Sequence, residues 1–234
     1  MEEHNHLEGQ SVDIEKHPKQ DFQVERLAFF SDAVFAIVIT LLVIEFKVPH
    51  ITDNSTVQDV WNQLLDLRYH FFTILFSFFL IASYWSRHHL LFKYIHNYNK
   101  QIIIANMLVL LPIIFLPFTT AFIAESFMTL LVKNNEIIVL GLSLFTLNHF
   151  LAALALYILY WLTTNKYKGM SYPIPIKEKI GLVSNLWFMI TFFGTLFIAT
   201  LFTSNQYIIL SVELIVFPSA KIFQKIYKKR LTEK

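Results

Sequence analysis

The chain has 234 residues, of which 55% are apolar and 15% are charged, whereas typical soluble domains contain about 45–50% and about 25%. Phenylalanine occurs 24 times and glycine only 5 times, a composition typical of side chains that face lipid. The net charge of +2 is too small to indicate a nucleic-acid partner, and the absence of cysteine excludes disulfides and thiolate metal sites. We therefore expect a membrane protein.

Residues 1–25 begin with acidic and histidine-containing sequence and have no apolar stretch, so we expect a cytoplasmic tail and not a cleaved signal peptide. About 20 apolar residues are needed to cross a hydrocarbon core of about 30 Å, and their backbone must satisfy its own hydrogen bonds. The sequence predicts an all-α integral membrane protein with a six-helix transmembrane domain at 26–223 and a basic cytoplasmic tail at 224–234. The six predicted spans are Ala28–Val48, Tyr69–Trp85, Ile102–Ile123, Ile137–Leu162, Leu182–Phe202 and Tyr207–Phe223.

Two stretches depart from a plain span. The segment from Pro49 to Arg68 carries apolar residues at helical spacing in its second half, and Trp61 there is suited to the interface between membrane and water. The sixth predicted span is interrupted by Glu213 and Pro218.

The basic residues predict how the spans cross the membrane. With both termini in the cytoplasm, 16 of the 19 Lys and Arg residues lie on the inner side, as the positive-inside bias requires. The three on the outer side are Lys47, Arg68 and Lys133. The basic C-terminal tail either serves only as this topology signal or also contacts anionic lipid. Acidic residues predominate on the outer side, where they either attract cations to a pore mouth or are ordinary solvated charges: Glu45, Asp53, Asp59, Asp66, Glu125 and Glu136.

The first predicted span combines a long apolar run with Ser31, Asp32 and Thr40. An ionised group inside a membrane segment is costly unless it is paired or wetted. On a helical wheel of about 100° per residue, Asp32 lies about 140° from Ile37, which favours a structural anchor near Arg26 over a role beside Ile37. Ile37 is the centre of an apolar stripe that either contacts lipid and other helices or lines a pathway; its other members are Phe30, Ala33, Thr40, Leu41, Ile44 and Val48.

The same helix carries the pattern Arg26-x-x-x-Phe30-Ser31-Asp32, followed by Ala36-Ile37-x-x-Thr40-Leu41-Leu42. This pattern resembles the first-helix signature, RxxxFSD followed by AIxxTLL, of the transmembrane-protein-175 potassium channels of endolysosomes and bacteria. Six spans in one chain are similar to the bacterial form, which has one six-helix repeat per chain and assembles from four chains. Weaker similarity continues after the second predicted span and in the third, at Trp85-x-x-His88-His89, Asn106 and Pro117-Phe118.

The resemblance implies a potassium-selective cation channel in the bacterial inner membrane, not an enzyme and without a cofactor. It implies a homotetramer in a lipid bilayer, with the pore formed by oligomerisation and lined by the first helix. No re-entrant filter loop is implied, and the sequence contains no TVGYG-like run. Carried onto matching positions, Ile37 and Leu41 form an apolar constriction, and Thr40 adds hydroxyls near which potassium passes. Ile44 lies just past the signature, and its place on the helical wheel assigns it to the same constriction. The implied structural network at the cytoplasmic end comprises Arg26, Ser31 and Asp32, which we expect Trp85, His88 and His89 to join.

Two other function classes compete with a channel. A membrane metalloenzyme needs several His-rich clusters with carboxylates at ligand spacing, whereas this sequence has one His-His pair, so no metal site is expected. The alternative function is a secondary transporter that uses the intramembrane groups of Asp32, His149 and Glu213. Against it, the first span has none of the glycine or proline breaks found in many transporter helices.

Overall fold

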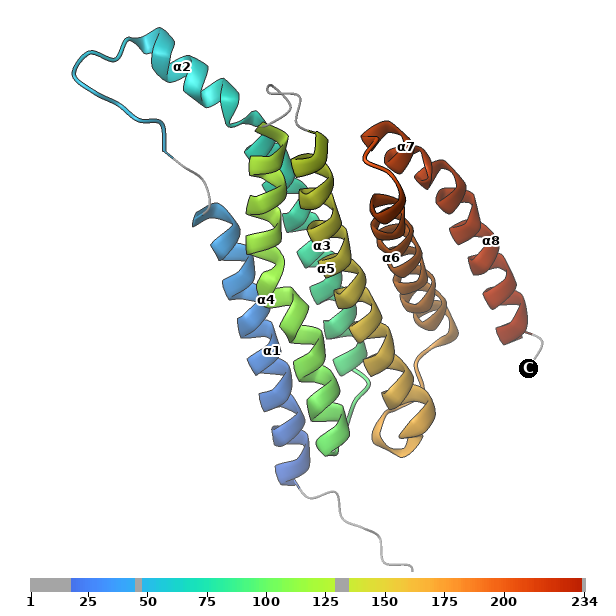
Figure 1. Cartoon of the computed structure of the whole chain (residues 1–234). Coiled ribbons are helices and arrows are strands. Elements are labelled where there is room, and N and C mark those ends of the chain that lie inside the picture. Colours follow the sequence, from blue (N-terminus) through green and yellow to red (C-terminus); the bar gives the residue numbers. More distant parts are fainter. Residues whose placement is uncertain (1–17, 45–47, 129–134, 233–234) are drawn as a thin grey trace, which may run out of the picture.

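The computed structural model describes residues 18–44, 48–128 and 135–232, most of which are helical (Figure 1). Six helices are long and apolar enough to cross a membrane, which confirms the predicted all-α fold with six spans. A π-helical turn, Leu162–Lys166, and a 3₁₀ turn, Lys168–Met170, follow the fourth span. The α-helices are α1 (Pro18–Ile44), α2 (Val57–Asp66), α3 (Arg68–Phe92), α4 (Lys100–Met128), α5 (Asn135–Trp161), α6 (Ile176–Phe202), α7 (Gln206–Ser211) and α8 (Glu213–Thr232).

The helix ends differ from the sequence prediction. α1 starts at Pro18 and not at Ala28, and α3 continues to Phe92 although its predicted span ends at Trp85. His88 and His89 therefore lie inside α3, not after it. A helix continues beyond its apolar segment where its backbone groups bond to one another and its polar side chains find partners. A prediction based on the length of the apolar segment does not include these additional polar turns.

The sixth predicted span is divided into two helices. The side chain of Asn205 accepts hydrogen bonds from the backbone N–H groups of Tyr207 and Ile208 and so caps α7. α8 then starts at Glu213 and contains Pro218. It continues to Thr232, so it extends through most of the segment that was predicted as a tail.

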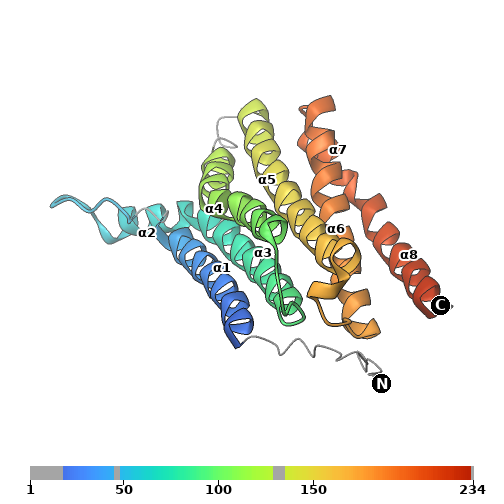
Figure 2. The same cartoon turned by 90° about the horizontal axis from the view of Figure 1, so that it is seen from below.

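The spans pack in an order that leaves α1 at one edge of the bundle (Figures 1 and 2). α1 contacts α3 and α4, α4 contacts α5, α5 contacts α6, and α6 contacts α8. α4 and α5 are the most buried spans, and α1 and α8 are among the least buried. Because successive spans alternate in direction, α1 begins and α8 ends at the same end of the bundle, here called the basic end because it carries Lys93, Lys100, Lys166 and Lys177.

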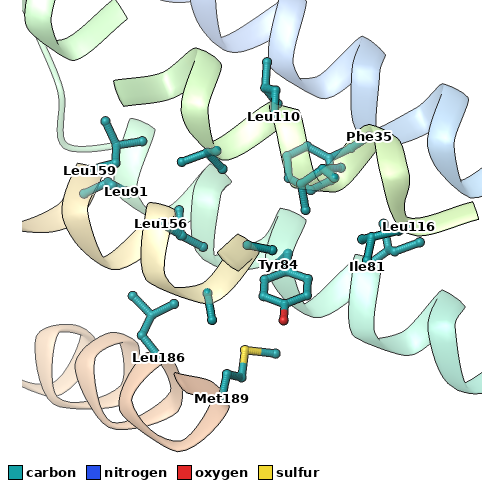
Figure 3. Packing of buried hydrophobic residues seen from close by; sticks show 14 of the residues in the cluster. Phe35, Ile81, Tyr84, Leu91, Leu110, Leu116, Leu156, Leu159, Leu186 and Met189 are labelled. Atoms are coloured by element: carbon teal, nitrogen blue, oxygen red, sulfur yellow. The ribbon is translucent and has the colours of Figure 1, made fainter. Parts of the chain in front are cut away.

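The apolar core lies where α3, α4 and α5 meet, with contributions from the neighbouring helices (Figure 3). Phe35 of α1 and Met189 of α6 approach this core from opposite sides, and Tyr84 of α3 is almost completely buried in it. The Tyr84 hydroxyl donates to the backbone carbonyl of His149 in α5 at 3.0 Å. Its buried polar atom is thereby satisfied, as the interior of a membrane protein requires.

At the basic end, the loop between α3 and α4 is joined to the loop between α5 and α6, and these two loops are here called the joined corners. A bridge connects Ile95, between α3 and α4, with Ser171, between α5 and α6. The N–H of Tyr172 donates to the carbonyl of Tyr94 at 2.7 Å. The Tyr94 hydroxyl donates to Glu178 of α6 at 2.7 Å, and this hydrogen bond raises the pKa of Tyr94. These bonds hold α3, α4, α5 and α6 together at the basic end.

α4 and α5 approach each other closely at Gly141. A Cβ atom added to this glycine would lie 2.9 Å from Cβ of Ser126 and 3.2 Å from Cδ1 of Ile123, both in α4. Small residues at such crossings let two membrane helices pack backbone to backbone. Gly141 therefore fixes the distance between the two most buried spans.

Gly141→Ala adds a methyl group that must displace Ser126, so we expect the free energy of unfolding to fall by about 1–3 kcal/mol. Thermal melting of the purified protein in detergent measures this change. Gly181→Ala in α6 is the control, because an added Cβ would have nothing within 4 Å there. An unchanged melting temperature for Gly141→Ala would show that the α4–α5 crossing is not tightly packed.

Candidate functional site

α1 has one packed face and one exposed face. The packed face lies against α3 and α4, and its residues are spaced by three, four and seven positions, as one side of a helix requires. Its members are Val24, Ser31, Phe35, Val38 and Leu42, all of them buried. The other side of the helix is therefore left for contacts outside the single chain.

The exposed face contains the stripe predicted from the helical wheel. Ile37 is 58% exposed, Leu41 37% and Ile44 73%. Thr40 and the small residue Ala33 are exposed on the same side. The two sides of α1 are therefore those that the helical wheel predicts. Ile37, Thr40, Leu41 and Ile44, here called the exposed row, lie on one side, and Ser31 lies on the other.

The Thr40 hydroxyl is oriented by its own helix. Its Oγ1 donates to the carbonyl oxygen of Ile37 at 2.7 Å. Because the proton of the hydroxyl is engaged there, the oxygen presents its remaining lone pairs toward the exposed side. An oxygen with free lone pairs at mid-helix is suited to a transient contact with a cation.

Asp32 lies between α1 and α3 and is half-buried. Its Oδ1 accepts a hydrogen bond from Nε1 of Trp85 at 2.9 Å. The indole ring of Trp85 also packs on the ring of His89, with 5.4 Å between their centroids. This bond anchors the part of α1 nearest the basic end to α3.

A second polar connection runs through the packed face. Ser31 Oγ donates to the Leu27 carbonyl at 3.0 Å and accepts from Nδ2 of Asn106 in α4 at 2.9 Å. Asn106 Oδ1 in turn accepts from Nε2 of His88 in α3 at 2.7 Å. One buried chain of hydrogen bonds therefore links α1, α4 and α3. Sequence reasoning noted Asn106 only as part of the resemblance, because a single amide in an apolar helix gives no sign of which partners it meets.

The expected place of Arg26 in this network stays a prediction. The structure describes no ion pair between the side chains of Arg26 and Asp32, although both lie in its described ranges. Six residues separate them, which turns them about 120° apart around the helix. Arg26 is exposed and lines a cavity with Phe30 and Tyr98, so its side chain lies on the side of α1 that carries Ile37.

A cavity of about 420 Å³ lies beside Asp32 at the basic end. Glu25 and Asp32 of α1, His89 of α3, and His96 and Tyr172 of the joined corners are among its lining residues. Although it contains acids and histidines, no three such side chains are placed to hold a metal ion in the part of the chain that the structure describes.

The three residues of the transporter alternative occupy separate places. Asp32 contacts Trp85, whereas the ring of His149 stacks on that of Phe193 with a centroid distance of 4.6 Å. Glu213 is buried and accepts from Thr195 Oγ1 at 3.0 Å. Among the described residues, no hydrogen bond or ion pair connects any two of these three groups.

Removing the Asp32–Trp85 bond should destabilise the protein more than it alters ion preference. We expect Asp32→Ala and Trp85→Phe each to lower the free energy of unfolding by about 1.5–3 kcal/mol, because a hydrogen bond to a charged group is lost. The double variant should be little worse than either single one, because both changes remove the same contact. Thermal melting measures the stability of all three variants, with Glu25→Ala as the control on the exposed surface of α1. Additive losses would show that the two side chains act independently.

Residues 26–117 match the sequence model of the family described as the endosomal/lysosomal potassium channel TMEM175. A potassium channel of Chryseobacterium is 37% identical over 101 residues, which are 43% of this chain and 49% of that protein. A potassium channel of Chamaesiphon minutus is 40% identical over 108 residues, 46% of this chain and 52% of that protein. The matches span about half the length of these curated relatives.

Two solved structures share the fold. One is a crystal structure of a lysosomal potassium-selective channel TMEM175 homolog from Chamaesiphon minutus, with a TM-score of 0.64 and 24% identity over 88% of this chain and 98% of that one. The other is a variant of the potassium channel MtTMEM175 in complex with a nanobody–MBP fusion protein, with a TM-score of 0.62 and 18% identity over 93% and 99%. The chain thus carries TMEM175-family sequence at residues 26–117 on the fold of the bacterial TMEM175 channels.

Proposed function

We propose that the protein is a potassium-preferring cation channel in which α1 helices from several copies line one pore. The observation that carries this proposal is the exposed apolar row of α1, which lies opposite a fully packed face. One chain has one such row, and a pore needs walls on all sides. The channel is therefore a homo-oligomer in this proposal, and the resemblance of its first helix to the TMEM175 signature implies a tetramer.

The exposed surfaces of α1 and α3 differ in a way that favours this assignment. α3 exposes bulky aromatic side chains, among them Phe71, Phe72, Phe76 and Phe79, which suit contact with lipid. The exposed side of α1 from Ala33 to Ile44 contains alanine, isoleucine, threonine, leucine and valine and no aromatic residue. Smaller side chains let several copies of a helix approach a common axis.

The row accounts for closure and ion preference without a filter loop. Rings of Ile37, Leu41 and Ile44 that are narrow enough to exclude water form a barrier by dewetting. Potassium sheds part of its hydration shell at lower cost than the smaller sodium ion. The Thr40 oxygens offer partial replacement for lost water, so selectivity arises at this level.

The arrangement of the chain agrees with the direction that the charges predict. The basic end, where α1 begins and α8 ends, faces the cytoplasm of a bacterial cell in this proposal. The opposite end carries Asp53, Asp59, Asp66 and Glu136 and faces outward. Carboxylates repeated around an oligomer raise the local concentration of cations at the outer mouth.

Ile37→Asn and Leu41→Asn should each wet the constriction and raise the basal potassium flux, because an amide removes the dewetted barrier. We expect increases of at least about tenfold, which corresponds to about 1.4 kcal/mol of barrier. Potassium flux from liposomes that contain the purified protein measures this effect. Val43→Asn is the matched control, since Val43 is 64% exposed but lies about 120° from Ile37 on the helix. Saturable, coupled exchange in place of passive flux would favour a transporter.

Thr40→Val removes the hydroxyl and keeps the shape of the side chain. We expect the preference for potassium over sodium to fall while assembly and conductance are kept, because only the oxygen ring is lost. Reversal potentials under bi-ionic conditions give the permeability ratio. A reversal potential equal to that of the wild type would mean that Thr40 does not contact the permeating ion.

A further inference from the structure

α2 is an amphipathic helix whose apolar side is not buried by the residues that the structure describes. None of its ten residues is buried, and Val57 is 89% and Trp61 56% exposed. The polar residues Asp59, Asn62 and Asp66 lie on the other side. A contiguous apolar surface of this kind on a folded protein marks an interaction site.

Although it packs little, α2 is held in a defined position. Thr56 and Asp59 form a reciprocal capping box at its start, and the hydrogen bonds from Thr56 lower the pKa of Asp59. Gln63 exchanges two bonds with the backbone of His50, at 2.7 and 3.3 Å. Only Leu67 separates α2 from α3. The helix is therefore preorganised for a partner, which lowers the entropic cost of binding.

α2 projects beyond the edge of the bundle that α1 forms, as both views of the chain show (Figures 1 and 2). This is the edge that carries the exposed row of α1. The following step rests on the proposed function: if that row faces an axis shared with other copies, α2 reaches past its own α1 toward an adjacent copy. Its free apolar side then meets protein at the outer mouth.

A receiving surface lies at the root of α2. It is an open groove of about 440 Å³ whose apolar lining comes from the segment before α2, from α2 itself and from the start of α3: Val48, Pro49, Leu64, Leu67, Phe71 and Phe72. The one charged residue of the lining, Arg68, is held by the carbonyl of Leu65 at 2.9 Å and by Asp66 at 3.7 Å. The groove therefore offers mostly apolar contact.

We propose that the Trp61 side of α2 in one copy docks into the groove at the root of α2 in the adjacent copy. The Trp61 side of α2 and the groove are different surfaces that adjoin at Leu64, so the contact is head-to-tail and closes into a ring when the copies are related by rotation. The α2 helices then form a collar around the outer mouth of the assembly.

A second copy fits α2 better than a lipid surface does. Helices that lie in the membrane interface carry Lys and Arg on their polar side. α2 has no basic residue and carries two carboxylates, Asp59 and Asp66. A large aromatic side chain at the centre of its free side, Trp61, is typical of the anchor of a protein–protein contact.

Cysteine crosslinking tests the contact directly, because the native chain contains no cysteine. Two differently tagged versions of the full chain, one with Trp61→Cys and one with Phe72→Cys, are coexpressed, reconstituted and oxidised. We expect a disulfide that joins the two tags. Asn62→Cys paired with Phe72→Cys is the matched control, since Asn62 lies on the polar side of α2, and it should crosslink at least about tenfold less. Equal crosslinking of both pairs, or of neither, would overturn the proposal.

A second measurement tests the contact without cysteines or oxidation. Trp61→Ala should raise the protein concentration at which half of the oligomer forms in detergent by about tenfold, whereas Asn62→Ala should leave it unchanged. Quenching of Trp61 fluorescence by brominated lipid, taken as the difference from Trp61→Phe, would place α2 in the membrane and overturn the proposal. Potassium flux measured in the same liposomes separates the two proposals. If flux is intact and responds to Ile37→Asn but no interchain disulfide forms at α2, the channel proposal is supported and only the collar proposal is wrong.

Discussion

The polar attachment of α1 to α3 and α4 is the constraint on which the rest of the arrangement depends. Apolar helices in lipid gain little from burying apolar surface against one another, because lipid tails are equally apolar. The orientation of α1 is therefore set by the few groups that cannot face lipid. Asp32 is bonded to Trp85, and Ser31 is bonded to Asn106. Once these bonds are made, the direction of every other side chain on α1 follows from the helical period.

This attachment also explains why the exposed row is available. Ser31, Phe35 and Val38 are buried against the bundle, so Ile37 and Ile44 must point away from it. The row is on the surface because the polar anchor holds the other side of the helix inward. A protein whose α1 rotated freely would present no fixed row to other copies.

The sequence predicted the number of spans and the two sides of α1, but not the partners of its polar residues. Span number depends on apolar length, and the sides of a helix depend on a fixed angle per residue, so both can be calculated from the chain. The positions of Arg26 and Asn106 could not be derived in this way. Arg26 lies on the other side of α1 from its expected partner, and Asn106 meets Ser31 only because α4 crosses α1 at that height. Such meetings depend on how helices cross, which local sequence does not encode.

The joined corners at the basic end have a mechanical consequence for α1. The bridge between Ile95 and Ser171 joins four helices at the basic end, whereas α1 packs on α3 and α4 through buried side chains that extend from Val24 to Leu42. From Asp32 to Ile44 the helix is about 18 Å long at about 1.5 Å per residue. A tilt of about 5° around Asp32 would move Ile44 by about 1.5 Å. Because Val38 and Leu42 are buried against the bundle, such a tilt must carry the packed face with it, so movement of the exposed row is coupled to repacking of the core.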